Sequence, residues 1–106
     1  MDQSEVMKRL REFVLERSWG QFHTPENLVK SINIEAGELL ECFQWSSEPD
    51  AARVSEELAD VLTYCYLLAD RLHLNPQQIV LEKLRSTAEK YPVEKSRGSS
   101  RKYDQI

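Results

Sequence analysis

The sequence of 106 residues has little of what interrupts or cross-links a chain: three Gly, four Pro and two Cys. Cys42 and Cys65 stand singly in apolar segments with no Cys or His nearby at ligand spacing, so we expect small buried side chains and neither a disulfide nor a zinc site. No apolar run approaches the roughly 20 residues that span a bilayer, and the N-terminus lacks the basic and apolar regions of a signal peptide. We therefore expect a cytoplasmic protein without a membrane partner.

A large excess of charge of one sign is also missing. The net charge is -4, with 30% charged and 41% hydrophobic residues, a balance typical of a folded globular protein. This length predicts a single domain over residues 1–106. The charge is uneven, however, with -7 over residues 26–60 and +5 over residues 83–103. Such asymmetry suits a small polyanion held between cations and basic side chains, although it is also common on solvated surfaces; we expect no nucleic-acid polymer as a partner.

Apolar residues recur at helical spacing and no strand signal is present, which predicts an all-α fold, a small four-helix bundle-like protomer. The expected helices cover about residues 4–19, 25–45, 51–72 and 76–91, the first capped by Gly20. Residues 93–106 are basic and show no periodicity, which predicts a loosely ordered tail. A bundle of this size buries a thin core, so we expect self-association.

One acid lies inside an apolar face. With about 100° of rotation per residue, Glu35 falls between Cys42 and Leu28 in a continuous apolar arc, and Glu38 lies at its edge one turn further along. Burying a carboxylate is unfavourable unless it is paired or bound to a metal. Glu35 therefore needs a partner.

The third expected helix repeats this arrangement. Glu57 and Asp60 lie at the edge of its apolar arc, whereas Glu56 points to solvent. Two antiparallel helices would bring this pair to face Glu35 and Glu38, and a set of oxygen ligands without His favours Mg²⁺ or Mn²⁺ over zinc or iron. The alternative is a solvated acidic face whose i, i+3 spacing arises by chance.

Basic and aromatic residues supply candidate substrate contacts. Lys83 and Lys90 share one helix face and could reach phosphate oxygens, although ordinary surface lysines have the same spacing. Trp19 and Trp45 lie at the ends of expected helices, where a ring can stack on a base or pack against a satellite core. His23, beside a helix start, is typical of a hydrogen-bond donor in a loop.

Together these motifs resemble the MazG-like branch of the all-α nucleoside triphosphate pyrophosphohydrolases, and within it the dCTP pyrophosphatase subgroup. The resemblance rests on the two acidic pairs, on the segment 19–23, on Phe43-Gln44-Trp45 and on the ending from Lys90-Tyr91-Pro92 to Ser96-Arg97-Gly98. It implies Mg²⁺, with Mn²⁺ able to substitute, at Glu35, Glu38, Glu57 and Asp60. It also implies triphosphate contacts from Lys83, Lys90 and Arg97, and base or sugar contacts from Trp19, His23, Trp45 and Tyr64.

The resemblance implies hydrolysis of a deoxynucleoside triphosphate, dCTP or a modified dCTP, to the monophosphate and pyrophosphate, which would clean the nucleotide pool. It also implies a homodimer or homotetramer whose sites are completed across subunits. The chain departs from the family at Thr87, where members often carry Asn, so a ligand contact from that amide is not expected. The alternatives are a non-catalytic helical oligomerisation module with a cation in its acidic seam, and a nucleotide sensor without turnover.

Overall fold

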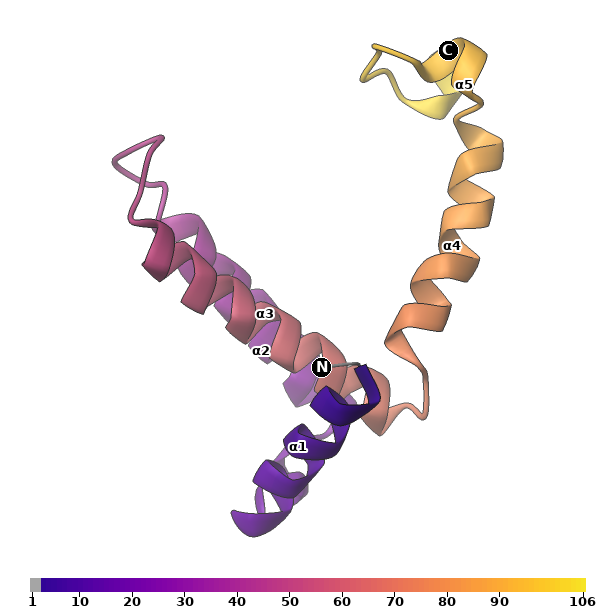
Figure 1. The fold of residues 1–106 in the computed structure, drawn as a ribbon. Coiled ribbons are helices and arrows are strands. Elements are labelled where there is room, and N and C mark those ends of the chain that lie inside the picture. The colour runs from indigo at the N-terminus through magenta and orange to yellow at the C-terminus, as the bar shows by residue number, and fades with distance from the viewer. Residues whose placement is uncertain (1–2) are drawn as a thin grey trace. The chain divides into compact units, whose positions relative to one another are not determined.

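The computed structural model describes residues 3–106, and this part of the chain contains helices and turns but no strand. The all-α prediction is therefore confirmed. The elements, labelled as in Figure 1, are α1 (Gln3–Glu16), the 3-10 helix η1 (Trp19–Phe22), α2 (Pro25–Glu41), α3 (Ala51–Arg71), α4 (Pro76–Lys90), α5 (Val93–Ser96) and the 3-10 helix η2 (Tyr103–Gln105). Residues 3–74 and 75–106 form two compact units, which are described separately below. Within residues 3–106, every helix is too short or too polar to cross a membrane.

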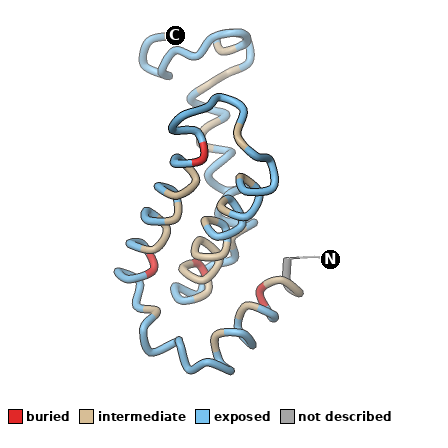
Figure 2. The backbone as a smooth tube through the Cα atoms, turned by 90° about the vertical axis from the view of Figure 1, so that its left-hand side faces the viewer, coloured by how far each residue is buried: buried red, intermediate tan, exposed pale blue. Residues whose placement is uncertain are grey.

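Helices α2 and α3 form an antiparallel hairpin, the most extensively packed pair of elements (Figure 1). The side chain of Thr24 caps α2 by accepting a hydrogen bond from the Asn27 amide at 3.2 Å, and Asp50 caps α3 by accepting from the Ala52 amide at 3.0 Å. The core is thin, as Figure 2 shows. Among the described residues, the buried apolar side chains are those of Met7, Leu28, Cys42 and Ala69.

Helix α1 packs against α3 and ends earlier than the sequence predicts. Ser18 adopts a left-handed conformation with φ 53°, which turns the chain after α1. Trp19 then begins η1, and its ring meets the edge of Phe13 at a centroid distance of 5.6 Å. The expected cap at Gly20 is wrong because this residue lies within η1.

Helix α2 also ends before its predicted boundary, at Glu41 rather than near Trp45. The amides of Cys42, Phe43 and Gln44 each donate to the carbonyl three residues earlier, at 3.2, 3.0 and 3.2 Å, which tightens the chain into turns. Trp45 follows in the loop between α2 and α3 and is 89% exposed. The prediction that Trp45 ends this helix is therefore wrong, because α2 stops four residues earlier.

The unit of residues 75–106 begins with α4. Asn75 caps the N-terminus of this helix, because its side chain accepts a hydrogen bond from the Gln78 amide at 3.1 Å. The segment expected to be a loosely ordered tail contains α5 and η2. The rings of Tyr91 and Tyr103 meet edge to face at 6.1 Å, which joins the end of α4 to η2. A four-residue helix has no hydrophobic period, so the sequence pattern could not reveal α5.

Candidate metal centre and adjoining cavity

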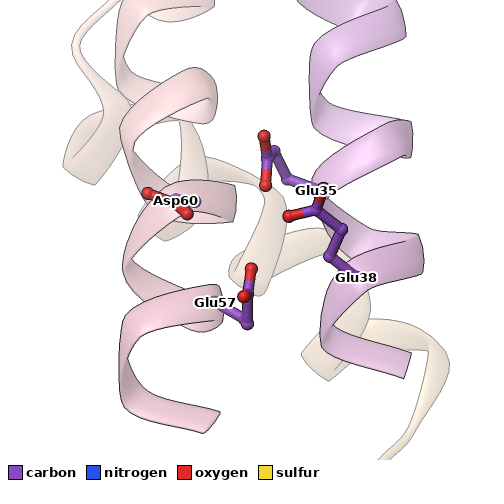
Figure 3. Close-up of side chains that lie close together, drawn as sticks. All are labelled: Glu35, Glu38, Glu57 and Asp60. Carbon is purple, nitrogen blue, oxygen red and sulfur yellow. The ribbon is translucent and has the colours of Figure 1, made fainter. Parts of the chain in front are cut away.

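Four carboxylates converge in the seam of the α2 and α3 hairpin (Figure 3). Glu35 and Glu38 project from α2 toward α3, and Glu57 projects from α3 back toward α2. With Asp60, each residue offers an oxygen, and these oxygens all lie within 4.8 Å of one another. The juxtaposition predicted from the two i, i+3 pairs is present in the structure, because an antiparallel hairpin turns both pairs inward.

The cluster is electrostatically crowded. Hydrogen bonding to Glu35 and repulsion from its charge raise the pKa of Glu38. Burial, followed by the interaction with Glu38, raises the pKa of Glu57. One oxygen of Glu35 and one of Glu57, Oε2 in each case, are buried without a hydrogen-bond partner among the described residues. Buried polar atoms are normally satisfied, so these two oxygens fit a site that can accept a cation.

The donor set suits a hard divalent cation. All four candidate ligands are carboxylates, and the nearby Cys42 thiol instead donates to the Glu38 carbonyl at 3.7 Å. Oxygen-only sites of this kind bind Mg²⁺, Mn²⁺ or Ca²⁺ in preference to softer metals. The neighbouring acids Glu41 and Glu56 are exposed and do not belong to the cluster. The acidic cluster can therefore hold a metal ion.

A cavity of about 220 Å³ adjoins the cluster at Asp60. It is enclosed by α1, by α3 and by the segment that joins α1 to α2. Three of the residues expected to contact the substrate line it, namely Trp19, His23 and Tyr64, and the remaining walls are Leu10, Phe13, Val14, Thr63 and Leu67. The structure thus places aromatic and hydrogen-bonding groups beside a candidate metal ligand.

The aliphatic and phenyl walls of this cavity were not predicted as site residues from the sequence. The signal was present, because Leu10, Phe13 and Val14 form part of the apolar face expected for the first helix. Leu67 lies seven residues after Asp60 and therefore on the same face of α3. Helical periodicity places these side chains on the apolar faces of their helices, but it does not reveal the cavity that they enclose.

The other predicted substrate contacts are not among the residues that line this cavity. Trp45 lies in the exposed loop and does not line the cavity. Lys83, Lys90 and Arg97 belong to the unit of residues 75–106. Within that unit, the Lys90 ammonium lies 4.9 Å from the centre of the Tyr103 ring, a cation–π contact. The Thr87 hydroxyl donates a hydrogen bond at 3.1 Å to the Lys83 carbonyl, which lies one turn earlier in α4.

Comparison with known proteins places these features in a family. The model of the MazG-like family matches residues 30–106, which include all four acids of the cluster. The chain belongs to the MazG-like family. In this MazG-like chain, the cavity residues Trp19 and His23 precede the matched region, so the family match does not include them.

Individual relatives of the MazG-like chain cover nearly all of it. It is 43% identical to dCTP pyrophosphatase 1 of Mus musculus and 41% identical to dCTP pyrophosphatase 1 of Homo sapiens, over 96% of this chain in both cases. The chain spans 66% of the length of each of these relatives. A crystal structure of a pyrophosphatase from Archaeoglobus fulgidus matches with 42% identity and a TM-score of 0.78, covering 84% of this chain and 91% of that one.

Proposed function

We propose that this MazG-like protein hydrolyses deoxynucleoside triphosphates, dCTP or a modified dCTP above all, to the monophosphate and pyrophosphate. The observation that carries the proposal is the four-carboxylate cluster next to a cavity lined by Trp19, His23 and Tyr64. The names of the relatives, dCTP pyrophosphatase 1 and pyrophosphatase, support the same chemistry. Removal of damaged or surplus nucleotides from the pool would be the biological use of this reaction.

In this proposal, Glu35, Glu38, Glu57 and Asp60 bind Mg²⁺, and Mn²⁺ can substitute. The two unpartnered carboxylate oxygens and the crowding that raises the pKa of Glu38 support a cation at this position. When bound, the ion would neutralise charge that develops on the phosphate oxygens and lower the pKa of a water molecule. One carboxylate of the cluster accepts the proton of the attacking water.

The cavity receives the base and sugar. Trp19 and Tyr64 offer aromatic surface, and the Tyr64 hydroxyl and the His23 ring offer hydrogen bonds. Its volume of about 220 Å³ lies below the roughly 300 to 1,000 Å³ of most ligand pockets, which favours a base with one ring over a purine. The triphosphate extends from this cavity over Asp60. Lys83, Lys90 and Arg97 are proposed phosphate contacts because their charge is opposite to that of the triphosphate. The exposed indole of Trp45 is a further stacking surface for the substrate.

We further propose that the protein works as a homodimer or homotetramer. One face of α4 carries apolar side chains that remain exposed, Val80 by 64%, Leu81 by 61% and Leu84 by 57%. A groove of about 570 Å³ on α4 is lined by some of these residues together with Lys83 and Thr87. Contiguous exposed apolar surface typically marks an association site. The single domain predicted from the length of the chain stays part of this proposal.

The test is release of pyrophosphate from a panel of normal and modified deoxynucleoside triphosphates with Mg²⁺. We expect the highest kcat/KM for dCTP or a modified dCTP, complete loss of activity in EDTA, and recovery with Mg²⁺ or Mn²⁺. An oligomerisation module would release pyrophosphate from no substrate, and a sensor would bind a nucleotide without turnover. Either result would refute the proposed reaction.

A further inference from the structure

An ion pair joins α1 to α3 next to the cavity. The Arg11 guanidinium donates from Nε and Nη2 to Oδ1 of Asp70, at 2.9 and 2.6 Å. The two residues are 59 positions apart in the chain. The other ion pairs among residues 3–106 join positions one or four apart, as Arg9 and Glu5 do within α1. The Arg11 and Asp70 pair is therefore the one among them that ties two distant elements together.

This pair lies beside walls that two cavities share. Arg11 and Asp70 line a second cavity, of about 470 Å³, together with Val14, His23 and Leu67. Those last three residues also line the smaller cavity beside Asp60. The two cavities therefore share these three residues as walls, and the ion pair lines the larger cavity but not the smaller one.

The apolar packing of α1 is weak enough for one polar contact to matter. Phe13 is 45% exposed and Leu15 is 80% exposed, so much of the apolar surface of α1 is not covered. The side chains of the ion pair are themselves accessible, Arg11 by 61% and Asp70 by 30%. Accessible ion pairs contribute little to global stability. An effect of this pair is therefore expected on the local position of α1 rather than on unfolding.

We propose that Arg11 and Asp70 are positioning residues, which fix α1 against α3 and so hold Phe13, Val14 and the following Trp19 at the cavity that receives the base. This inference rests on the proposed function, because it takes the cavity as the substrate site. Neither residue touches the substrate in this proposal. Both act through the walls that the two cavities share.

The kinetic test uses Arg11→Ala, Asp70→Ala, the double Ala variant and the exchanged pair Arg11→Asp with Asp70→Arg. Each single variant should raise KM for dCTP about three- to tenfold with little change in kcat, the pattern of lost substrate binding. The double Ala variant should be no worse than either single one, because the two residues act as one unit. The exchanged pair should recover at least half of the lost affinity on a logarithmic scale. Arg9→Ala, which removes an ion pair within the same helix, is the matched control and should leave KM unchanged.

A second readout does not depend on activity. In a Trp45→Phe background, Trp19 is the one remaining tryptophan, and its ring packs against Phe13. Arg11→Ala should shift its emission to longer wavelength and increase quenching by acrylamide, and the exchanged pair should reverse both changes. If the wild-type protein hydrolyses no nucleotide, the proposed function fails, but this fluorescence measurement still decides whether the pair positions α1.

Two results would overturn the inference. If both Ala variants keep the wild-type Trp19 emission and KM, the pair is a surface ion pair without a positioning role. If the effects of the single variants add in the double variant and the exchanged pair gives no recovery, Arg11 and Asp70 act separately. A local role predicts little change in melting temperature, because solvent-accessible ion pairs contribute little to global stability. If KM rises only in those variants whose melting temperature also falls, the pair acts on global stability, and a local role is contradicted.

Discussion

Replacing Glu38 with Gln should make the metal-free protein more stable and the enzyme inactive. The Glu38 carboxylate lies with three other carboxylates, and one oxygen of each of the four lies within 4.8 Å of the others. Hydrogen bonding to Glu35 and repulsion from its charge raise the pKa of Glu38, and removing one negative charge from this group relieves that repulsion. The same change removes a ligand, so kcat should fall by roughly 100-fold or more.

The size of the metal effect can be worked out from linkage. A cation present at about 100 times its Kd stabilises the folded state by about 2.7 kcal/mol if it binds only that state. For a domain of about 100 residues this raises the melting temperature by roughly 10 °C. The wild-type protein should show this increase with Mg²⁺, whereas Glu38→Gln should melt higher without metal and respond little to it.

The assay is thermal unfolding with EDTA or Mg²⁺, paired with pyrophosphate release on the same samples. Glu56→Gln is the matched control, because Glu56 is an exposed acid adjacent to Glu57 and lies outside the cluster. It should keep the Mg²⁺ response and the rate. A Glu38→Gln protein that still gains about 10 °C from Mg²⁺, or a Glu56→Gln protein that loses this gain, would refute the assignment of the metal ligands.

Three further outcomes are expected. The pKa values of Glu38 and Glu57 are raised above 4.5, so between pH 4.5 and the raised values the metal-free folded protein binds more protons than the unfolded chain. Its free energy of unfolding, measured with urea, should therefore fall as pH rises through this window. Glu57→Gln should make this dependence on pH weaker. Trp45→Ala tests the base contact proposed at Trp45: an indole that stacks on the base would make KM rise roughly tenfold to a hundredfold on truncation, with no change in melting temperature because it is 89% exposed, whereas an unchanged KM would place the base in the cavity alone and exclude Trp45 from the substrate site. Leu84→Glu on the exposed face of α4 should shift sedimentation toward the monomer, whereas a wild-type protein that is already an active monomer would contradict self-association.

The positions of the long helices could be predicted from the sequence because their signals are local. Thr24 and Asn75 cap helices that begin with Pro25 and Pro76, and the structure shows both caps as hydrogen bonds. The facing of the four acids was also predictable, since the helical period fixes which side chains share a face. The ends of α1 and α2 were not, because the Trp19 and Phe13 contact and the tight turns after Glu41 compete with continued helix.

Long-range geometry limited the prediction of the site. The periodicity of each helix does not reveal that Arg11 pairs with Asp70, because the two residues lie on different helices and 59 positions apart in the chain. The cavity beside Asp60 likewise depends on how α1 crosses α3, which the periodicity of neither helix specifies. The sequence therefore predicted the ligands of the candidate metal centre but not the enclosure next to it.

The conflict at Glu35 explains why the acids were the most informative feature of this chain. On the face of α2 between Cys42 and Leu28, a sequence selected only for folding would have an apolar residue. This chain has Glu35 there, and the Oε2 atom of its partly buried carboxylate has no hydrogen-bond partner. Local inconsistencies of this kind concentrate at functional sites, where a ligand compensates for them. Here the compensation would be a cation, which would offset the repulsion between α2 and α3 and strengthen the hairpin. Binding of metal and stability of the hairpin should then be coupled, so the ion that serves catalysis would also complete the fold.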